Sequence, residues 1–410
     1  MAAPAIEVRA RRNQPLGMPP ARFLRDYWQK RPLLVRNAFA DFAPPLAPDE
    51  LAGLACMDGA LARIVVHGKS RPPDFGLRRN DGKWKVFTGP FNDATFTGLP
   101  DTTWTLLVQD ADKWDEATAA LLKPFGFIPS WRIDDVMISY ATDGGGVGAH
   151  VDQYDVFLLQ GLGQRHWSID TRPNPPTAFR DDVPLKLLRE FHPTHAWMLD
   201  PGDMLYLPPG VPHDGVAVGE CMTFSIGMRA PAAGELLFDF AAHVAESLPE
   251  SRRFADPELK PAGANGEIDD AALQRARRTL GSVANAMDKE AFADWFGRFI
   301  TRYRVAQGPS PRARPIDRAV LARRLPSATL ERDPWSRFAW ARHGRYARLY
   351  AGGAAFGAPL AWARVLAGSF RKLDGAQLAK LPHRARGVAL LAELINAGHL
   401  RLRRLISHPG

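Results

Sequence analysis

Short apolar runs separated by turn residues dominate the chain between residues 61 and 230. Glycine, proline and aspartate interrupt these runs in turns such as GLG, PGD and PPGVP. Many short strands at this spacing favour a sandwich or barrel. The clearest predicted strands cover residues 104–108, 135–140, 156–160, 166–169, 204–207 and 222–228. Upstream, the segment 22–39 starts with helical spacing and ends in the strand-like run LLV.

After Pro231 the apolar residues change to helical spacing. Three segments carry it: ELLFDFAAHVAESL, DAALQRARRTLGSVANAM and KEAFADWFGRFITRYR. They predict a helical region over 232–307. Its apolar stripes pack either within the chain or against a second copy, and the pattern alone leaves both open.

A linker is predicted at 308–315, where the sequence reads GPSPRARP. Beyond it, IDRAVLARRL is expected to form a helix and FAWARHGRYARLYAGG a hairpin that turns at His343 and Gly344. GVALLAELINAGHL then predicts a helix that ends at Gly398. This order suggests a winged-helix-like domain, so three domains are expected: 1–231, 232–307 and 308–410.

Charge divides the chain unevenly. The net charge is +9, but residues 301–410 hold 21 Lys/Arg and 5 Asp/Glu, a balance of +16, which leaves −7 for residues 1–300. Such asymmetry indicates separate modules and an anionic partner for the basic one, for which ribosomal RNA qualifies. A solvated basic face that only maintains solubility is the competing interpretation.

The two cysteines, Cys56 and Cys221, form no disulfide framework, so a reducing compartment is expected. The N-terminal residues lack the apolar core of a secretory signal. The longest uncharged stretch, 349–363, is too short to span a membrane. A cytoplasmic location without membrane association is therefore predicted.

The candidate chemistry centres on ISYATDGGGVGAHVDQYDVFLLQ. His150 and Asp152 are two residues apart, and residues two apart in a strand face the same side. A third ligand, His213, follows 61 residues after Asp152, just after the run MLYLP. Two histidines and one carboxylate leave open metal positions, which is typical of non-haem iron(II) oxygenases, whereas a structural zinc site leaves none. A cupin isomerase or a zinc hydrolase on the same ligands is the alternative.

A second histidine pair occurs in HPTH, at His192 and His195. It has no nearby carboxylate on a strand, so both are expected to be surface histidines. His166 alternates with the apolar Trp167 and is expected to be structural.

Several longer motifs occur in a fixed order: YWQKRPLLVRNAF, WRIDDVMIS, GGGVGAHVDQYDVFLLQ, GQRHW, LDPGDMLYLPPGVPH and FSIGMRAP. Together they resemble the ribosomal oxygenase branch of the JmjC hydroxylases, and the resemblance covers most of the chain. It implies a mainly β fold with α, a double-stranded β-helix (cupin/JmjC barrel). A helical dimerisation region and a winged-helix-like C-terminal domain follow it.

The resemblance also implies roles for the metal and cosubstrate residues. His150, Asp152 and His213 would bind Fe(II). Arg165 would bind the distal carboxylate of 2-oxoglutarate, for which a guanidinium fork is suited. Thr223 and Ser225 share a strand face and would complete this pocket, although relatives often have asparagine where Thr223 stands.

For the substrate, the resemblance implies that Tyr154 and Met137 flank an arginine side chain and that Asp135 pairs with its guanidinium. Asp134 is the alternative partner, since adjacent strand residues face opposite ways.

The expected function is hydroxylation of an arginine in a large-subunit ribosomal protein by hydrogen abstraction and hydroxyl rebound, with 2-oxoglutarate and O2 as cosubstrates. Bacterial members of the family act on the sixteenth protein of that subunit, and a homodimer is expected. Two alternatives stay within the enzyme class, a histidyl hydroxylase and a lysine demethylase. A third is a nucleic-acid-binding regulator with a vestigial barrel.

Overall fold

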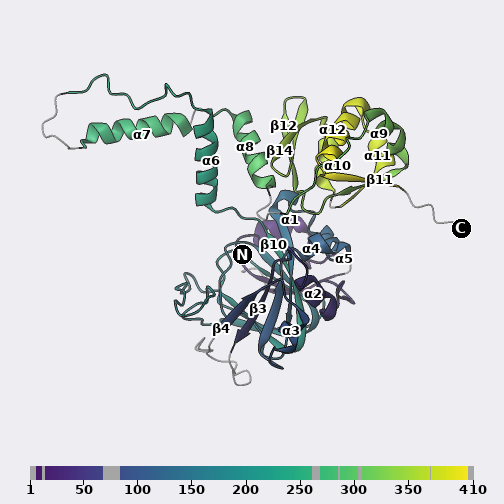
Figure 1. Cartoon of the computed structure of the whole chain (residues 1–410). Helices are drawn as coiled ribbons and strands as arrows, with labels where there is room; N and C mark the ends of the chain where they lie inside the picture. The colour runs from purple at the N-terminus through teal and green to yellow at the C-terminus, as the bar shows by residue number, and fades with distance from the viewer. Residues whose placement is uncertain are drawn as a thin grey trace. The chain divides into compact units, whose positions relative to one another are not determined.

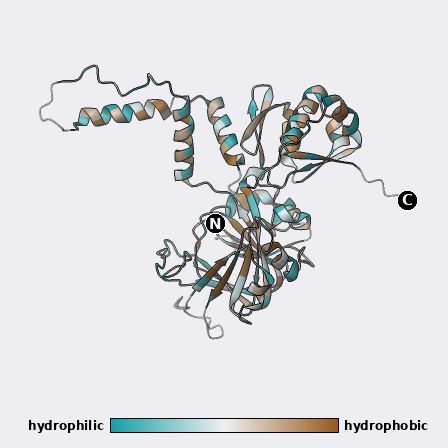
Figure 2. Cartoon of the chain, in the orientation of Figure 1, coloured by the Kyte–Doolittle hydropathy of each residue, from teal (hydrophilic) through white to brown (hydrophobic). Residues whose placement is uncertain are grey.

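The computed structural model describes residues 6–11, 14–67, 84–260, 268–284, 287–302, 307–369 and 371–404. They form two compact units, Met1–Ala230 and Pro231–Gly410. Figure 2 shows hydrophobic residues concentrated on the strands of the first unit. Among the described residues, no helix combines the length and the apolar character that a membrane span requires.

The first unit is built on one ten-stranded sheet in the order β1-β2-β9-β7-β10-β6-β5-β3-β4, with β8 also paired to β7 (Figure 1). The pairing is antiparallel except between β1 and β2. The strands are β1 (Glu7–Arg9), β2 (Leu33–Arg36), β3 (Ala62–His67), β4 (Trp84–Thr88), β5 (Trp104–Val108), β6 (Ile133–Ala141), β7 (Val156–Ile169), β8 (His195–Leu199), β9 (Met204–Leu207) and β10 (His213–Met228).

Short helices connect the strands of this unit. They are α1 (Pro20–Asp26), α2 (Pro48–Ala55), α3 (Asp93–Thr97), α4 (Ala111–Trp114) and α5 (Glu116–Ala120), with 3-10 turns at Lys123–Phe125 and Ser130–Arg132. Helix α1 begins with a proline in its first turn, where the missing N–H costs nothing, and it buries Phe23. The Phe23 ring packs edge-on against Tyr206 of β9, so α1 covers the sheet at the strand that precedes His213.

Two segments that were predicted as separate strands form a single strand in the structure. Residues 156–160 and 166–169 both belong to β7, and the GLG sequence between them forms an irregularity in the β7–β10 pairing instead of a turn. Gly163 has φ +59°, and a Cβ there would lie 1.9 Å from the carbonyl oxygen of Glu220. This bulge changes which residues face inward, because Val156 and Leu158 share a hydrophobic cluster with Trp167 and Ile169.

The second unit starts with α6 (Ala233–Ser247), α7 (Asp270–Ala284) and α8 (Lys289–Thr301), which occupy the segments predicted to be helical. Helix α8 packs on the following hairpin, where Gly297 lies so close to Tyr350 that a Cβ would meet its ring at 2.3 Å. This contact joins residues on both sides of the expected boundary at 308. The division into three domains stays a prediction.

The remainder of the second unit contains α9 (Arg318–Arg324), a 3-10 turn (Leu325–Ser327), β11 (Ala328–Arg332), β12 (Phe338–His343), β13 (Tyr346–Ala351), β14 (Ala354–Ala358), α10 (Leu360–Gly368), β15 (Lys372–Asp374), α11 (Gly375–Ala379), α12 (Arg384–Asn396) and β16 (Leu400–Arg404). The hairpin turn was predicted correctly, since His343 pairs with Tyr346 and Gly344 has φ +56°. Strand β11 lies between β15 and β16, although it precedes both in the chain.

Candidate active site

The three candidate metal ligands come from two segments that backbone hydrogen bonds hold together. His150 and Asp152 lie between β6 and β7, and His213 is the first residue of β10. The backbones of His150 and His213 exchange two hydrogen bonds of 3.0 Å each. The N–H of Gly210 donates to the carbonyl of Asp152 at 2.8 Å. The backbone therefore fixes the two segments before any side chain contributes.

Glycine residues before His150 allow the backbone of this segment to lie close to the neighbouring strands. A Cβ at Gly146 would lie 2.6 Å from the carbonyl oxygen of Gly215 on β10, and one at Gly145 would lie 2.4 Å from that of Trp104. Only glycine tolerates such close backbone contact. The run GGGVG is thus needed to bring His150 beside β10.

The ligand atoms converge on one point. The Asp152 carboxylate lies 3.7 Å from Nε2 of His213 and 4.0 Å from Nε2 of His150, and all three ligand atoms lie within 4.8 Å of one another. Nδ1 of His150 donates to the carbonyl of Gly148 at 2.8 Å, and Nδ1 of His213 donates to that of Val211 at 2.9 Å. These bonds leave both Nε2 lone pairs for a metal.

Burial, followed by the neighbouring His150, lowers the pKa of His213 to about 4. His213 is therefore neutral at physiological pH, which is the form that binds metal. Two imidazoles and one carboxylate, whose ligand atoms all lie within 4.8 Å of one another, match the facial donor set of non-haem iron(II).

Arg165 has the properties needed to bind an anion. It is 5% exposed on the inner face of β7, and its Nε donates to Sγ of Cys221 at 3.4 Å. Its guanidinium lies 5.7 Å from the ring centroid of Trp167, whose ring lies 5.9 Å from that of His213. Nη2 is buried and has no hydrogen-bond partner among the described residues. A buried N–H without an acceptor costs about 1–3 kcal/mol, and a carboxylate ligand would relieve this cost.

Thr223 and Ser225 are buried on the same inner face, opposite Gln160 and Leu158 of β7. The Thr223 hydroxyl donates to Oε1 of Gln160 at 3.0 Å. Nε2 of Gln160 in turn donates to the carbonyl of Leu162 at 2.8 Å. The hydroxyl hydrogen of Thr223 is thus already used within the protein. A direct role of Thr223 and Ser225 in cosubstrate binding stays a prediction.

Gln160 itself was missed by the sequence analysis. It is fully buried and controls the orientation of Thr223. The available signal was a lone amide at the end of the apolar run VFLLQ, since buried polar side chains need a specific partner.

Two of the expected substrate residues, Asp135 and Met137, lie on the same face as Ser225. Asp135 and Met137 of β6 pair with Gly227 and Ser225 of β10, and a Cβ on Gly227 would lie 3.1 Å from the Asp135 carboxylate. Tyr154 is 41% exposed, and its hydroxyl lies near enough to the Asp152 carboxylate to interact with its charge. Burial of this hydroxyl, then Asp152 and Asp135, raise the pKa of Tyr154, so the phenol keeps its proton.

Asp135 lies among other acidic groups. Its carboxylate accepts the backbone N–H of Asp110 at 3.1 Å. Burial raises the pKa of Asp135 to about 8, and the charges of Asp110, Asp134 and Asp112 contribute. Asp134 is adjacent to Asp135 in β6 and takes the opposite face. A cationic side chain is the ligand that this environment favours.

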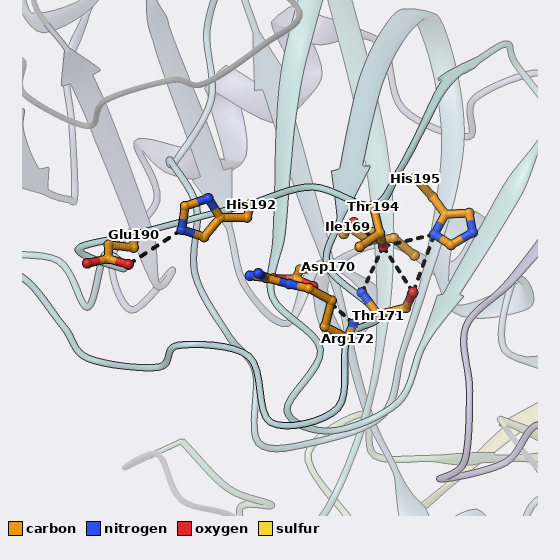
Figure 3. A network of polar contacts seen from close by, with 8 residues as sticks. All are labelled: Ile169, Asp170, Thr171, Arg172, Glu190, His192, Thr194 and His195. Carbon is orange, nitrogen blue, oxygen red and sulfur yellow. Dashed lines mark hydrogen bonds and ion pairs between the residues drawn. The ribbon is translucent and has the colours of Figure 1, made fainter.

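The second histidine pair does not converge on a metal position. Figure 3 shows the two imidazoles directed at different partners. Nε2 of His192 lies 3.4 Å from the exposed Glu190 carboxylate. Nδ1 of His195 lies 2.9 Å from the Thr194 hydroxyl and 3.4 Å from that of Thr171.

Comparison with known proteins identifies related domains and chains. The JmjC domain family matches residues 120–236, and the ROXA-like winged helix family matches residues 284–401. The ribosomal protein uL16 3-hydroxylase of Escherichia coli (strain K12) is 39% identical over 285 residues, which cover 69% of this chain and 71% of that protein. A probable ribosomal oxygenase of Haemophilus influenzae is 38% identical over 226 residues, covering 53% of this chain and 51% of that protein.

Solved structures of ribosomal oxygenases are also similar to this chain. The X-ray structure of E. coli YcfD matches with a TM-score of 0.80 at 34% identity, covering 95% of this chain and 99% of that one. YcfD in complex with cobalt and 2-oxoglutarate matches with a TM-score of 0.78 at 33% identity and the same coverage.

These matches confirm the predicted fold class, a JmjC/cupin barrel followed by a winged-helix domain. The chain belongs to the JmjC-domain ribosomal oxygenase family, whose members are 2-oxoglutarate-dependent dioxygenases.

Proposed function

We propose that this chain uses Fe(II), 2-oxoglutarate and O2 to hydroxylate C3 of an arginine in the large-subunit ribosomal protein uL16. The observation that supports it most strongly is the His150/Asp152/His213 cluster on the same face of the barrel as Arg165, whose buried Nη2 has no partner among the described residues. The E. coli relative named for the same activity supports the choice of substrate. A cytoplasmic location stays a prediction.

The residues of the chain have distinct tasks in this reaction. His150, Asp152 and His213 would hold the iron, and Arg165 would pair with the distal carboxylate of 2-oxoglutarate. Iron and cosubstrate, when bound, supply the oxidising chemistry that converts 2-oxoglutarate and O2 into succinate, carbon dioxide and a hydroxylated side chain. The buried face around Trp167 excludes water. The residues on the substrate side fix the position of the target carbon, which matters because small misplacements reduce the rate by large factors.

An arginine side chain fits the substrate side best. The guanidinium would pair with Asp135, while Tyr154 and Met137 would flank it. A neutral histidine side chain would leave the acidic group around Asp135 uncompensated, and a methylated lysine offers fewer N–H donors to it. The geometry and the relatives favour neither alternative. They also disfavour a vestigial barrel, since the ligand cluster is intact.

Mass spectrometry of uL16 tests this proposal. Cells that lack the chain should yield uL16 about 16 Da lighter than the wild type, the mass of one added oxygen in a hydroxylation. Fragmentation should place the difference on one arginine, and re-expression of wild type but not of His150→Ala should restore it. An unchanged mass in the deletion strain contradicts the assignment of uL16.

Peptide binding should depend on pH through Asp135. Its pKa of about 8 means that the carboxyl is largely protonated at neutral pH in the free protein. A guanidinium binds the carboxylate form, so binding releases a proton and affinity rises with pH, by up to about tenfold per unit below the pKa. A bound divalent metal also favours the carboxylate and moves the midpoint below 8.

Calorimetric titration of an arginine peptide between pH 6 and 9 measures this dependence. Asp135→Asn should bind weakly with a flat profile, whereas Asp181→Asn, which changes an exposed carboxylate paired with Arg189, should keep the wild-type slope. A flat wild-type profile would exclude Asp135 as the partner of the guanidinium.

The helices of the second unit support a homodimer. Leu237 and Phe238 of α6 are 69% and 79% exposed, and Leu273 and Leu280 of α7 are 56% and 73% exposed. Leu273 and Leu280 are seven residues apart and so share a helix face. Large apolar side chains exposed in this number are typical of an interface, and we assign it to a second copy of the chain. Sedimentation velocity of the full chain measures whether it forms this dimer in solution.

The basic C-terminal region fits ribosomal RNA better than duplex DNA. Helix α12, which follows α11 in the winged-helix order, buries most of its length, and its exposed residues are those of the first turn, including Arg384 and Arg386, and the acidic Glu393. Reading a major groove requires an exposed helix face. Arg386 instead lies 5.2 Å from the ring centroid of Tyr346, which is 47% exposed, a pairing of cation and aromatic that suits unpaired bases. RNA binding with a steep salt dependence would support this contact.

A further inference from the structure

A fully buried carboxylate, Asp155, directly follows Tyr154 and has no place in the chemistry described above. It accepts hydrogen bonds from the Tyr206 hydroxyl at 2.6 Å, from Nε2 of Gln29 at 2.9 Å and from Nη2 of Arg132 at 3.4 Å. The three donors come from β9, from the turn after α1 and from the 3-10 turn before β6. Asp155 therefore ties three separate segments to the start of β7.

The partners of Asp155 also contact one another. The backbone N–H of Gln29 donates to the Tyr206 hydroxyl at 2.8 Å, so this hydroxyl accepts one bond and donates another. Burial and Asp155 raise the pKa of Tyr206, which keeps the phenol protonated as a donor. The Trp28 ring stacks on Tyr206 at 6.0 Å, and the Arg132 guanidinium lies 5.7 Å from Trp28.

Gln29 reaches this position at a conformational cost. Its φ is +55°, in the left-handed region that residues other than glycine rarely adopt. Such strain persists only where the surrounding contacts compensate it, and the two bonds that Gln29 makes to Tyr206 and Asp155 do so.

The position of Asp155 determines where Tyr154 points. Asp152 belongs to the ligand cluster, whereas the Asp155 carboxylate bonds to Tyr206 and Gln29, so the bend at Gln153 and Tyr154 joins a residue of the site to a residue of this buried network. The backbone is held on either side of Tyr154, because Gly210 donates to the carbonyl of Asp152 and Met228 to that of Asp155, at 2.8 and 2.9 Å. With the backbone held on both sides, the buried bonds of Asp155 restrict rotation of this bend and so fix the direction of the adjacent Tyr154 side chain.

We infer that Asp155 is a positioning residue for substrate binding: through Tyr206, Gln29 and Arg132 it holds Tyr154 against the substrate arginine. The inference rests on the proposed function, because the importance of Tyr154 follows from the arginine pocket. It predicts that loss of the network weakens and misaligns the peptide while leaving 2-oxoglutarate binding intact.

Asp155→Asn tests the role directly. The asparagine keeps the size of the side chain but turns an amide N–H2 toward the donors Gln29 and Arg132. The Kd of an arginine peptide should rise about tenfold, a loss comparable to one hydrogen bond. Succinate formed per hydroxylated peptide should exceed one, and the KM for 2-oxoglutarate should stay within about twofold. Tyr206→Phe removes the two bonds of the hydroxyl but keeps the ring and the bonds that Gln29 and Arg132 donate to Asp155, so its effect should fall between the wild type and Asp155→Asn.

A matched control separates positioning from general loss of stability. Asp203 is another buried carboxylate of the first unit, 6% exposed, and accepts bonds from Arg36, from the N–H of Asn37 and from that of Asp200 at 2.8, 2.8 and 3.2 Å. Asp203→Asn should lower the Tm as Asp155→Asn does but keep wild-type peptide affinity and one succinate per product. Equal uncoupling in both variants would overturn the inference.

A measurement without substrate keeps the inference independent of the proposed function. The chain has seven tyrosines, so the 19F spectrum of fluorotyrosine-labelled protein is simple, and Tyr154→Phe assigns the Tyr154 signal. This signal should shift or broaden in Asp155→Asn and stay unchanged in Asp203→Asn. An unchanged Tyr154 signal in Asp155→Asn refutes the positioning role, whereas a wild-type enzyme that leaves the arginine peptide unmodified refutes the proposed function instead.

Discussion

The variant His150→Ala is expected to lose turnover of 2-oxoglutarate and to bind Fe(II) more than about 100-fold more weakly. Even the outer partners of metal ligands contribute about 10–100-fold to metal affinity, and His150 supplies one of only three protein ligands at this site. The remaining pair, Asp152 and His213, would not hold the metal in the geometry that leaves open positions on one side. Anaerobic metal titration and succinate formation measure the two effects.

Two surface histidines provide controls for this variant. His192 pairs with the exposed Glu190 carboxylate, and His195 contacts threonine hydroxyls outside the ligand cluster (Figure 3). Their alanine variants should retain metal affinity and turnover. Wild-type iron affinity in His150→Ala would remove the basis of the oxygenase assignment for these residues.

The second large effect is expected for Arg165→Ala. Two charge-assisted hydrogen bonds to a carboxylate contribute about 3 kcal/mol or more, so the KM for 2-oxoglutarate should rise on the order of 100-fold. Arg165→Lys should recover part of this loss, since lysine restores the charge but not the two-pronged geometry. Succinate formation at varied 2-oxoglutarate concentrations gives both values.

Stability measurements distinguish a binding role of Arg165 from a structural one. Its Nη2 lacks a partner among the described residues, so the unliganded protein should lose little stability on its removal. Arg172→Ala, which breaks an ion pair with the buried Asp170, should lower the Tm without changing the KM for 2-oxoglutarate. A large loss of Tm with an unchanged KM in Arg165→Ala would assign Arg165 to the core instead.

Much of the barrel and the site followed from sequence. The strands at 104–108 and 204–207 coincide with β5 and β9, because a buried strand requires a short apolar run between turn residues. His150 and Asp152 converge because alternation along extended backbone is set by covalent geometry. The motif order, which extends over most of the chain, identified the family.

Other features depend on pairings between distant segments. The sequence GLG was interpreted as a turn, yet Gly161 and Gly163 form a bulge within β7 because β10 continues alongside them. This bulge places Arg165 on the inner face together with residues 156 and 158, against simple alternation. In the C-terminal region, β14, α10, β15, α11 and β16 were not predicted, since short elements gain their stability from tertiary packing.

The sequence by itself determined which residues share a strand face, where the apolar runs lie and which side chains are able to bind a metal, because these follow from local geometry and side-chain chemistry. Only the tertiary structure decided that Gln160 uses the Thr223 hydroxyl, that Arg165 keeps an unsatisfied N–H, and that Asp155 binds Tyr206 and Gln29. Each of these depends on the register between strands or on a contact between segments up to 126 residues apart. Local sequence patterns contain no information about such register, since it is set by the packing of the whole core.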